Sequence, residues 1–344
     1  MQNDFQISPA YLHRAAVITM ASLSNSALAV AEDLRYGREI AKTQITQAPL
    51  FILGHWRSGT TLLHELLAQD HAHFQTPNTY QVVNPYTFLT TESFTTKAFP
   101  WLVPPKRPMD NMALSFTSPQ EDEFAPLLMT LTSLYLGISF PRRAVHYDRY
   151  MTFRDVDRAE VEAWKAAFLL FCKKITLQNP RALLLKSPPH TARIRTILEM
   201  FPDARFVHIH RNPYDVFQSQ RHFFDTAGWY TYLQKPDLAA LDNAILTRHE
   251  VMYDAFYEDL SLIPKGHFHE VRFDRLESDP VAQIEQIYSA LSLGGYDAFE
   301  PQLRAFTDSL KDYQKNTFAG LDAATRAVVA KRWSRSFEKG NYPI

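Results

Sequence analysis

The chain has 344 residues, and 46% of them are hydrophobic, which suffices for the core of one large α/β domain or two small ones. A formal net charge of −1 gives no overall electrostatic reason to bind nucleic acid or an anionic membrane. The only cysteine, Cys172, excludes an internal disulfide and favours a reducing, cytoplasmic location.

Residues 1–46 form a predicted N-terminal helical extension, with a helix from residue 9 to about residue 43. The longest uncharged run in it, Ala15 to Ala31, is rich in Ala, Ser and Thr and is too short and polar to span a bilayer. No basic segment followed by an apolar stretch and a cleavage site marks a signal peptide. We therefore expect a soluble protein without a transmembrane segment.

Four segments are typical of buried parallel strands because they are short apolar runs bounded by breakers. They are Pro49 to Leu53, Ala182 to Lys186, Arg205 to His210 and Phe268 to Phe273. Helical patterns follow the first three, which predicts an α/β fold with a parallel sheet and helices on both faces. Residues 76–150 break this rhythm and are expected to form an insertion over the site.

The loop after the first strand, in "FILGHWRSGTTLLHELL", is similar to a nucleotide-binding P-loop. Gly54, four residues and Gly59 have the expected spacing, but Thr60 stands where a kinase-type loop has its lysine, and Thr61 follows. Backbone N–H groups and the positive end of the next helix, Leu62 to Gln69, make this turn a predicted anion site.

The next two strands also end in turns that begin helices. Ser187 is a predicted N-cap before Pro188, and Asn212 is a predicted N-cap before Pro213. Ligands of open α/β sheets bind beyond the carboxyl ends of the strands. Three cations follow these ends and predict a ligand with several negative groups: Arg57, Lys186 and Arg211.

Together these motifs resemble the sulfotransferases that use 3′-phosphoadenosine 5′-phosphosulfate (PAPS), most closely the bacterial and tyrosylprotein-type branch. Arg57 to Thr61 matches the first signature of that family, and Arg211 with Ser219 eight residues later matches the second. The resemblance covers about Leu50 to Gly295 and implies one sulfotransferase domain over residues 47–344 with C-terminal helices. PAPS would be the co-substrate, and no metal would be needed.

The resemblance also implies residue roles. Arg57 would contact the 5′-phosphate and sulfonate, Lys186 would stabilise the leaving oxygen, and the 3′-phosphate would lie at Arg211 and Ser219. The remaining implied PAPS contacts are Ser58, Gly59, Thr60, Thr61 and, from the partly matching segment Glu338-Lys339-Gly340, Lys339. The family's tryptophan after the two threonines is replaced by Leu62, so the aromatic residue that stacks on adenine is not identified.

Two candidates compete for the base that accepts the acceptor proton. His190 lies four residues after Lys186 at the start of a predicted helix, where a neutral imidazole is favoured. The other is the acidic run Glu121, Asp122 and Glu123 within the insertion. The prediction leans narrowly to His190.

Other functions remain as alternatives: a kinase-like phosphotransferase, a non-catalytic PAPS-binding module, and a zinc hydrolase using His208, His210 and His222. The acceptor is expected to be a hydroxyl of a small molecule, lipid or sugar, and the protein a monomer or homodimer. Six aromatic residues either line an acceptor pocket or belong to the core: Tyr80, Tyr86, Phe88, Phe94, Phe99 and Trp101.

Overall fold

The computed structural model of the chain describes residues 6–107, 109–311, 318 and 320–344. Residues 1–5 of the predicted extension lie outside this range. A five-stranded parallel sheet in the order β2-β3-β1-β4-β5 forms its centre. The strands are β1 (Leu50–Leu53), β2 (Phe74–Gln75), β3 (Ala182–Lys186), β4 (Arg205–His210) and β5 (Phe268–Arg272).

All four predicted strands are therefore present, and the parallel sheet is confirmed. The sequence prediction missed β2, because two residues at the sheet edge give no alternating or continuous apolar pattern. Strand β1 lies in the middle, with Ile52 beside Lys186 of β3 and Leu53 beside His208 of β4. The carboxyl ends of β1, β3 and β4 consequently meet at one edge of the sheet.

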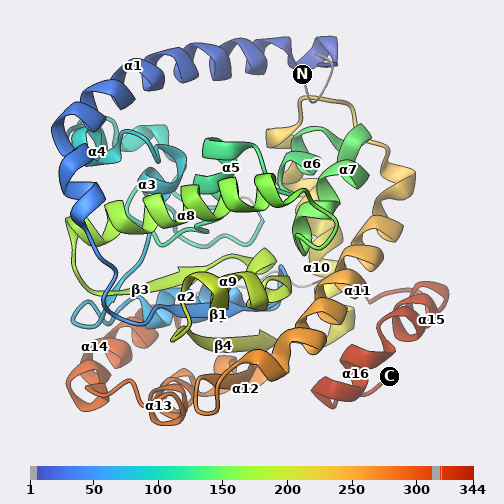
Figure 1. The fold of residues 1–344 in the computed structure, drawn as a ribbon. Helices are drawn as coiled ribbons and strands as arrows, with labels where there is room; N and C mark the ends of the chain where they lie inside the picture. The colour runs from blue at the N-terminus through green and yellow to red at the C-terminus, as the bar shows by residue number, and fades with distance from the viewer. Residues whose placement is uncertain (1–5, 108, 312–317, 319) are drawn as a thin grey trace.

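Helices cover both faces of the sheet, as predicted (Figure 1). Side chains alternate along β1, so that Phe51 and Leu53 belong to one core cluster and Leu50 and Ile52 to another. On the first face lie α3 (Thr79–Val83), α4 (Phe88–Ala98), α5 (Phe124–Thr130), α8 (Arg158–Gln178) and α9 (Ile194–Met200). On the second lie α2 (Thr60–Leu67), α12 (Phe273–Ser278), α13 (Pro280–Ala290) and α14 (Tyr296–Ser309).

Further helices pack beside the carboxyl edge of the sheet. Helices α10 (Pro213–Thr226), α11 (Leu241–Asp259), α15 (Ala323–Arg332) and α16 (Ser334–Gly340) share a separate cluster that includes Phe217, Trp333 and Phe337. This cluster confirms the predicted C-terminal helices. Two short helices, α6 (Leu136–Ser139) and α7 (Ala144–Asp148), lie between α5 and α8.

The N-terminal helix is longer than any segment that the sequence prediction weighed for membrane insertion. After the 3-10 turn η1 (Pro9–Tyr11), α1 runs from Leu12 to Lys42 along the edge of the molecule, above α4 and α8 (Figure 1). The expectation considered only Ala15 to Ala31. The whole segment Pro9–Lys42 is long and apolar enough, by length and composition alone, to cross a membrane. A segment of this kind also occurs in soluble proteins, so its contacts must decide its role.

Candidate active site

The loop between β1 and α2 has the backbone conformation expected of a phosphate-binding turn. Gly54 and Gly59 have φ values of 147° and 100°, and Arg57 also has a positive φ of 69°. A Cβ at Gly59 would lie 2.2 Å from the ring of Phe273, so only glycine fits between the loop and the first residue of α12. The first N–H groups of α2, from Thr60 onward, have no acceptor within their own helix and are available to an anion.

Arg57 joins the two sequence motifs in space. Its Nε donates to Oγ of the buried Ser219 at 2.9 Å, although the two residues are 162 positions apart. The structure therefore brings together the first loop and the helix after β4, as the resemblance implied. Ser58 contributes differently, because its hydroxyl donates to the carbonyl of His55 at 2.7 Å and stabilises the turn itself.

Arg211 lies at the carboxyl end of β4 with unused hydrogen-bonding capacity. Its guanidinium lies over the ring of Phe273, 4.5 Å from the centroid. The buried Nε makes no hydrogen bond to the described residues, and the carboxylate of Asp215 is 3.4 Å away. A buried cationic donor without a hydrogen-bond acceptor fits an anionic group of a ligand.

Two residues of the insertion that sequence reasoning missed also reach the loop. Asp110 accepts from Nη1 of Arg57 at 3.0 Å and lies 3.3 Å from Nε of Arg107. Arg107 donates to the hydroxyl of Thr61 at 3.3 Å. Burial lowers the pKa of Arg57, and the carboxylate of Asp110 opposes that effect. In "PPKRPMD" these two residues have no motif spacing that could have indicated their position.

The acidic run of the insertion lies against the segment that follows β3. Lys186, whose side chain is 2% exposed, donates to Oε1 of Glu121 at 3.0 Å. The other oxygen of Glu121 accepts the hydroxyl proton of Tyr135, which in turn accepts from the indole N–H of Trp56 at 3.0 Å. Burial and the Glu121 carboxylate raise the pKa of Tyr135, so this hydroxyl is a proton donor at neutral pH.

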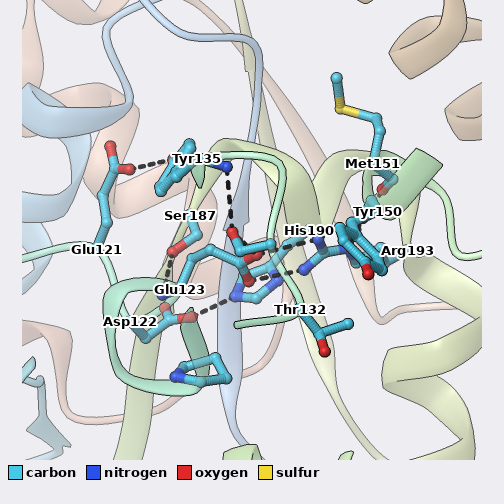
Figure 2. A network of polar contacts seen from close by, with 12 residues as sticks. Glu121, Asp122, Glu123, Thr132, Tyr135, Tyr150, Met151, Ser187, His190 and Arg193 are labelled. Atoms are coloured by element: carbon cyan, nitrogen blue, oxygen red, sulfur yellow. Dashed lines mark hydrogen bonds and ion pairs between the residues drawn. The ribbon is translucent and has the colours of Figure 1, made fainter. Parts of the chain in front are cut away.

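The two following acids are paired as well, but deeper in the protein. Oδ1 of Asp122 lies 2.5 Å from Nε2 of His190, and both side chains are fully buried (Figure 2). Three aromatic rings contact the imidazole: Phe51, Trp164 and Phe168. The structure thus encloses His190 in the core.

Glu123 forms a forked pair with Arg193 at 2.7 and 3.1 Å (Figure 2). It also accepts from the hydroxyl of Ser133. Its backbone N–H donates to the hydroxyl of Ser187 at 2.9 Å. Ser187 occupies the predicted N-cap position with Pro188 after it, but its hydroxyl makes no capping bond to the 3-10 helix η5 (Pro188–Ala192). In contrast, Asn212 caps α10 as predicted, accepting from the N–H of Tyr214.

The remaining candidates lie further out. Lys339 is an exposed residue of α16, next to Gly340, whose carbonyl accepts from Arg272 at the end of β5. His208 and His210 lie against Glu270, whereas His222 packs on Phe318. Among the residues that the structure describes, no group of three or more His, Cys, Asp or Glu side chains could hold a metal ion. The zinc-hydrolase alternative therefore has no supporting ligand set here.

Known proteins resemble this chain in sequence and in fold. Residues 49–298 match the model of the sulfotransferase family. The chain belongs to the sulfotransferase family. It is 36% identical over 342 residues, 99% of its length and 87% of the relative's, to omega-hydroxy-beta-dihydromenaquinone-9 sulfotransferase Stf3 of Mycobacterium bovis, and equally to its Mycobacterium tuberculosis counterpart.

Two solved sulfotransferase structures have the same fold. STF1 from Mycobacterium tuberculosis superposes with a TM-score of 0.71 at 19% identity, covering 97% of this chain and 88% of that one. STF9 from Mycobacterium avium gives 0.74 at 17% identity, covering 100% and 89%. The predicted PAPS-dependent sulfotransferase class is thereby confirmed, and family membership favours sulfuryl transfer over the kinase and non-catalytic alternatives.

Proposed function

We propose that the protein binds PAPS at the carboxyl ends of β1, β3 and β4 and transfers its sulfuryl group to a lipid hydroxyl. The observation that carries this proposal is the contact of 3.0 Å between Lys186 and Glu121 beside the loop of Arg57. A cation for the leaving oxygen and a carboxylate for the acceptor proton thus lie at one place. The absence of a P-loop lysine suits a donor whose transferred group is not a Mg²⁺-bridged γ-phosphate.

The residues present fit the donor's charges. The 5′-phosphate and sulfonate would lie at Arg57 and the amides of Ser58, Gly59, Thr60 and Thr61. The 3′-phosphate would lie at Arg211 and Ser219, supported by the Nε of Arg211, which ion-pairs with Asp215 but makes no hydrogen bond to the described residues, and by the contact between Arg57 and Ser219. Lys339 remains an additional candidate at the same edge of the sheet.

In the proposed reaction, Glu121 accepts the proton of the acceptor hydroxyl while that oxygen forms its bond to sulfur. The bond between sulfur and the bridging oxygen of the donor breaks, and Lys186 with Arg57 stabilises the negative charge left on the phosphate. PAPS supplies the activated sulfuryl group. Glu121 is favoured over His190 because its side chain is partly exposed, whereas His190 and Asp122 are fully enclosed.

A lipid acceptor is favoured by the relative that is named for a hydroxylated menaquinone and shares 36% identity over nearly the whole chain. The aromatic residues of the insertion divide between two environments. Tyr80 and Phe88 belong to the core, whereas Tyr86, Phe94, Phe99 and Trp101 are exposed. Only the exposed set remains available to an apolar acceptor or its surroundings.

The nucleotide site is tested with Arg211→Ala. We expect it to weaken binding of PAPS and of 3′-phosphoadenosine 5′-phosphate by about tenfold to a hundredfold, because a charge-assisted hydrogen bond contributes about 1.5–3 kcal/mol. Adenosine 5′-phosphosulfate, which lacks the 3′-phosphate, should lose much less. Binding is measured by calorimetric titration of each nucleotide.

The matched control is Arg221→Ala, on the following helix α10 and paired with Asp242, and it should bind all three nucleotides like the unmodified protein. Equal weakening of PAPS and adenosine 5′-phosphosulfate by Arg211→Ala would remove Arg211 from the 3′-phosphate site. A thermal shift with ATP–Mg²⁺ but not with PAPS would contradict the donor assignment as a whole.

A further inference from the structure

Helix α1 carries apolar side chains on the side that faces away from the protein. Leu12, Met20, Leu23, Val30 and Leu34 recur at helical spacing and are all exposed, Leu34 by 83%. We call these five residues the outward face. The opposite side packs on the protein through the buried residues Glu32 and Ile40, so the outward face is left without a partner in the protein. In Figure 1 the body of the protein lies on one side of α1 only.

Polar side chains attach α1 to the protein at two points along its length. Glu32 is buried, where its Oε1 lies 2.5 Å from Nζ of Lys174 and its Oε2 accepts from the N–H of Thr90 at 2.9 Å. Near the other end, Arg14 donates to the carbonyl of Trp229 at 2.6 Å. A helix that crossed a bilayer would have to abandon this buried ion pair, which is costly. The contacts therefore keep α1 flat against the protein with its outward face accessible.

Three basic side chains lie at the C-terminal end of α1, next to the outward face. Arg35, Arg38 and Lys42 are exposed and recur at i, i+3 and i+7, so they lie along one side of the last turns of the helix. Arg38 follows Leu34 by four residues and therefore continues its stripe. An apolar stripe that ends in basic residues is complementary to acyl chains covered by anionic headgroups, despite the near-zero net charge of the whole chain.

An exposed aromatic cluster lies in the neighbouring element. Phe94 of α4 contacts Phe99, and Phe99 contacts Trp101 of the 3-10 helix η2 (Pro100–Leu102), with ring centroids 6.0 and 6.4 Å apart. Phe94 is 69% and Trp101 73% exposed. Thr90 ties the first turn of α4 to Glu32 of α1, so the cluster belongs to the element packed on that helix. Tryptophan and phenylalanine at such exposure are typical of side chains that enter a lipid interface, but the bond to the buried Glu32 places α4 on the protein-facing side of α1, away from the outward face.

We propose that the outward face of α1, with Arg35, Arg38 and Lys42, docks on a bilayer containing anionic lipid, with α1 lying in the plane of the membrane. A second copy of the chain is the competing occupant. The apolar surface is too wide for a single helix seam, because Val17 and Leu28 are exposed beside the outward face. This surface is separate from the transfer site, and only its purpose, access to a lipid acceptor, rests on the proposed function.

The test is flotation of the full chain with vesicles of phosphatidylcholine alone and of phosphatidylcholine mixed with phosphatidylglycerol. We expect the protein to float with the mixed vesicles and much less with the neutral ones. The triple variant Leu23→Gln, Val30→Gln and Leu34→Gln should lose at least about tenfold in vesicle partition, since three apolar side chains leave the membrane. The variant Arg35→Gln, Arg38→Gln and Lys42→Gln should lose the preference for anionic vesicles.

The matched control is a triple variant of exposed apolar residues on other helical elements, Val251→Gln, Leu262→Gln and Val328→Gln, which should float normally. PAPS titration of every variant shows that folding and the donor site persist, so failure of the membrane proposal stays distinct from failure of the donor assignment. Absence of flotation with either vesicle, or unchanged flotation of the α1 triple variant, would overturn the proposal. A concentration-dependent dimer in analytical ultracentrifugation that the triple variant dissociates would assign the outward face to a second copy.

Discussion

At the scale of single residues, three consecutive acids serve different purposes because their burial differs. Glu121 is partly exposed and contacts Lys186, while Asp122 and Glu123 are enclosed with His190 and Arg193. A buried charge whose partner is removed costs about 3–5 kcal/mol. Asp122 and Glu123 are therefore expected to matter for stability, and Glu121 for the reaction.

Glu121→Gln should lower the rate of sulfuryl transfer by about a hundredfold to ten-thousandfold, since the amide cannot accept the acceptor proton. Lys186→Ala should lower it on the order of a hundredfold through the loss of charge stabilisation at the leaving oxygen. Neither variant should change the affinity for the product nucleotide much. Rapid-quench single-turnover assays and nucleotide titrations measure the two quantities.

Asp122→Asn and His190→Gln are the corresponding controls in the enclosed pair. Both should lower the melting temperature, and both should retain transfer at temperatures where they are folded. If His190→Gln is folded but inactive while Glu121→Gln is active, the histidine is the base and Glu121 only positions Lys186.

At the scale of elements, the loop after β1 depends on one close approach to the start of α12. The ring of Phe273 lies against Gly59 on one side and beneath the guanidinium of Arg211 on the other. The phosphate loop and the cation after β4 are thus coupled through a single aromatic ring. A substitution at Gly59 should therefore displace the guanidinium of Arg211.

Gly59→Ala should lower both the stability and the affinity for PAPS, because its Cβ would displace Phe273 and with it Arg211. Gly266→Ala is a suitable control, since Gly266 also has a positive φ of 81° but a Cβ there meets nothing within 4 Å. The control should lose only about 1–2 kcal/mol of backbone strain and bind PAPS normally. Urea unfolding and nucleotide titration compare the two; equal losses in both variants would show that Phe273 adapts freely.

The sequence predicted those elements whose signal is local. Buried strands such as Arg205 to His210 are recognisable by continuous apolar runs, and Asn212 by the proline that follows it. In contrast, β2 is too short to show a pattern. Ser187 is a residue type that often caps helices, but its hydroxyl instead accepts a hydrogen bond from the backbone N–H of Glu123, 64 residues away in the sequence.

The same distinction applies to the site. The positions of Arg57, Lys186 and Arg211 follow from strand ends, which neighbouring parallel strands bring together. The contacts of Asp110 and Tyr135 come from an insertion without a repeating pattern, and no spacing rule relates them to the sheet. The division of the chain at residues 46 and 47, the cytoplasmic location, the absence of nucleic-acid binding and the monomeric or dimeric state remain predictions.

At the scale of the whole molecule, a buried histidine connects the phosphate loop to the C-terminal helices. The ring of His55 lies 5.0 Å from that of His249, which stacks on Trp333 at 3.8 Å. Burial lowers the pKa of His55 from 6.5 to about 4, and it also holds the pKa of His249 well below 6.5. Both imidazoles are therefore neutral in the folded protein at neutral pH.

Stability should consequently decrease in acid. Below pH 6.5 the unfolded chain binds protons that the folded protein binds only near pH 4, so the free energy of unfolding falls as the pH falls from 6.5 to about 4. Each such histidine contributes a slope of up to about 1.4 kcal/mol per pH unit. His55→Asn keeps a donor for the carbonyl of Trp56. It should make the free energy of unfolding depend less steeply on pH in this range. Chemical unfolding at several pH values measures this, with the exposed His13→Asn as a control that should leave the curve unchanged.

The pairing of Glu121, Asp122 and Glu123 with Lys186, His190 and Arg193 also bears on partial unfolding. The loops proposed to bind the donor follow strands of the parallel sheet, whereas the carboxylate proposed as the base lies in the separate segment that contains residues 121–135. Local opening of the insertion would thus yield a species that retains nucleotide yet transfers nothing, and water would reach the leaving oxygen. The buried contacts of Asp122 and Glu123 keep that segment packed on the core. The lifetime of this closed state can be measured by hydrogen exchange of residues 121–135. That lifetime sets an upper limit on how long a bound donor is protected from hydrolysis.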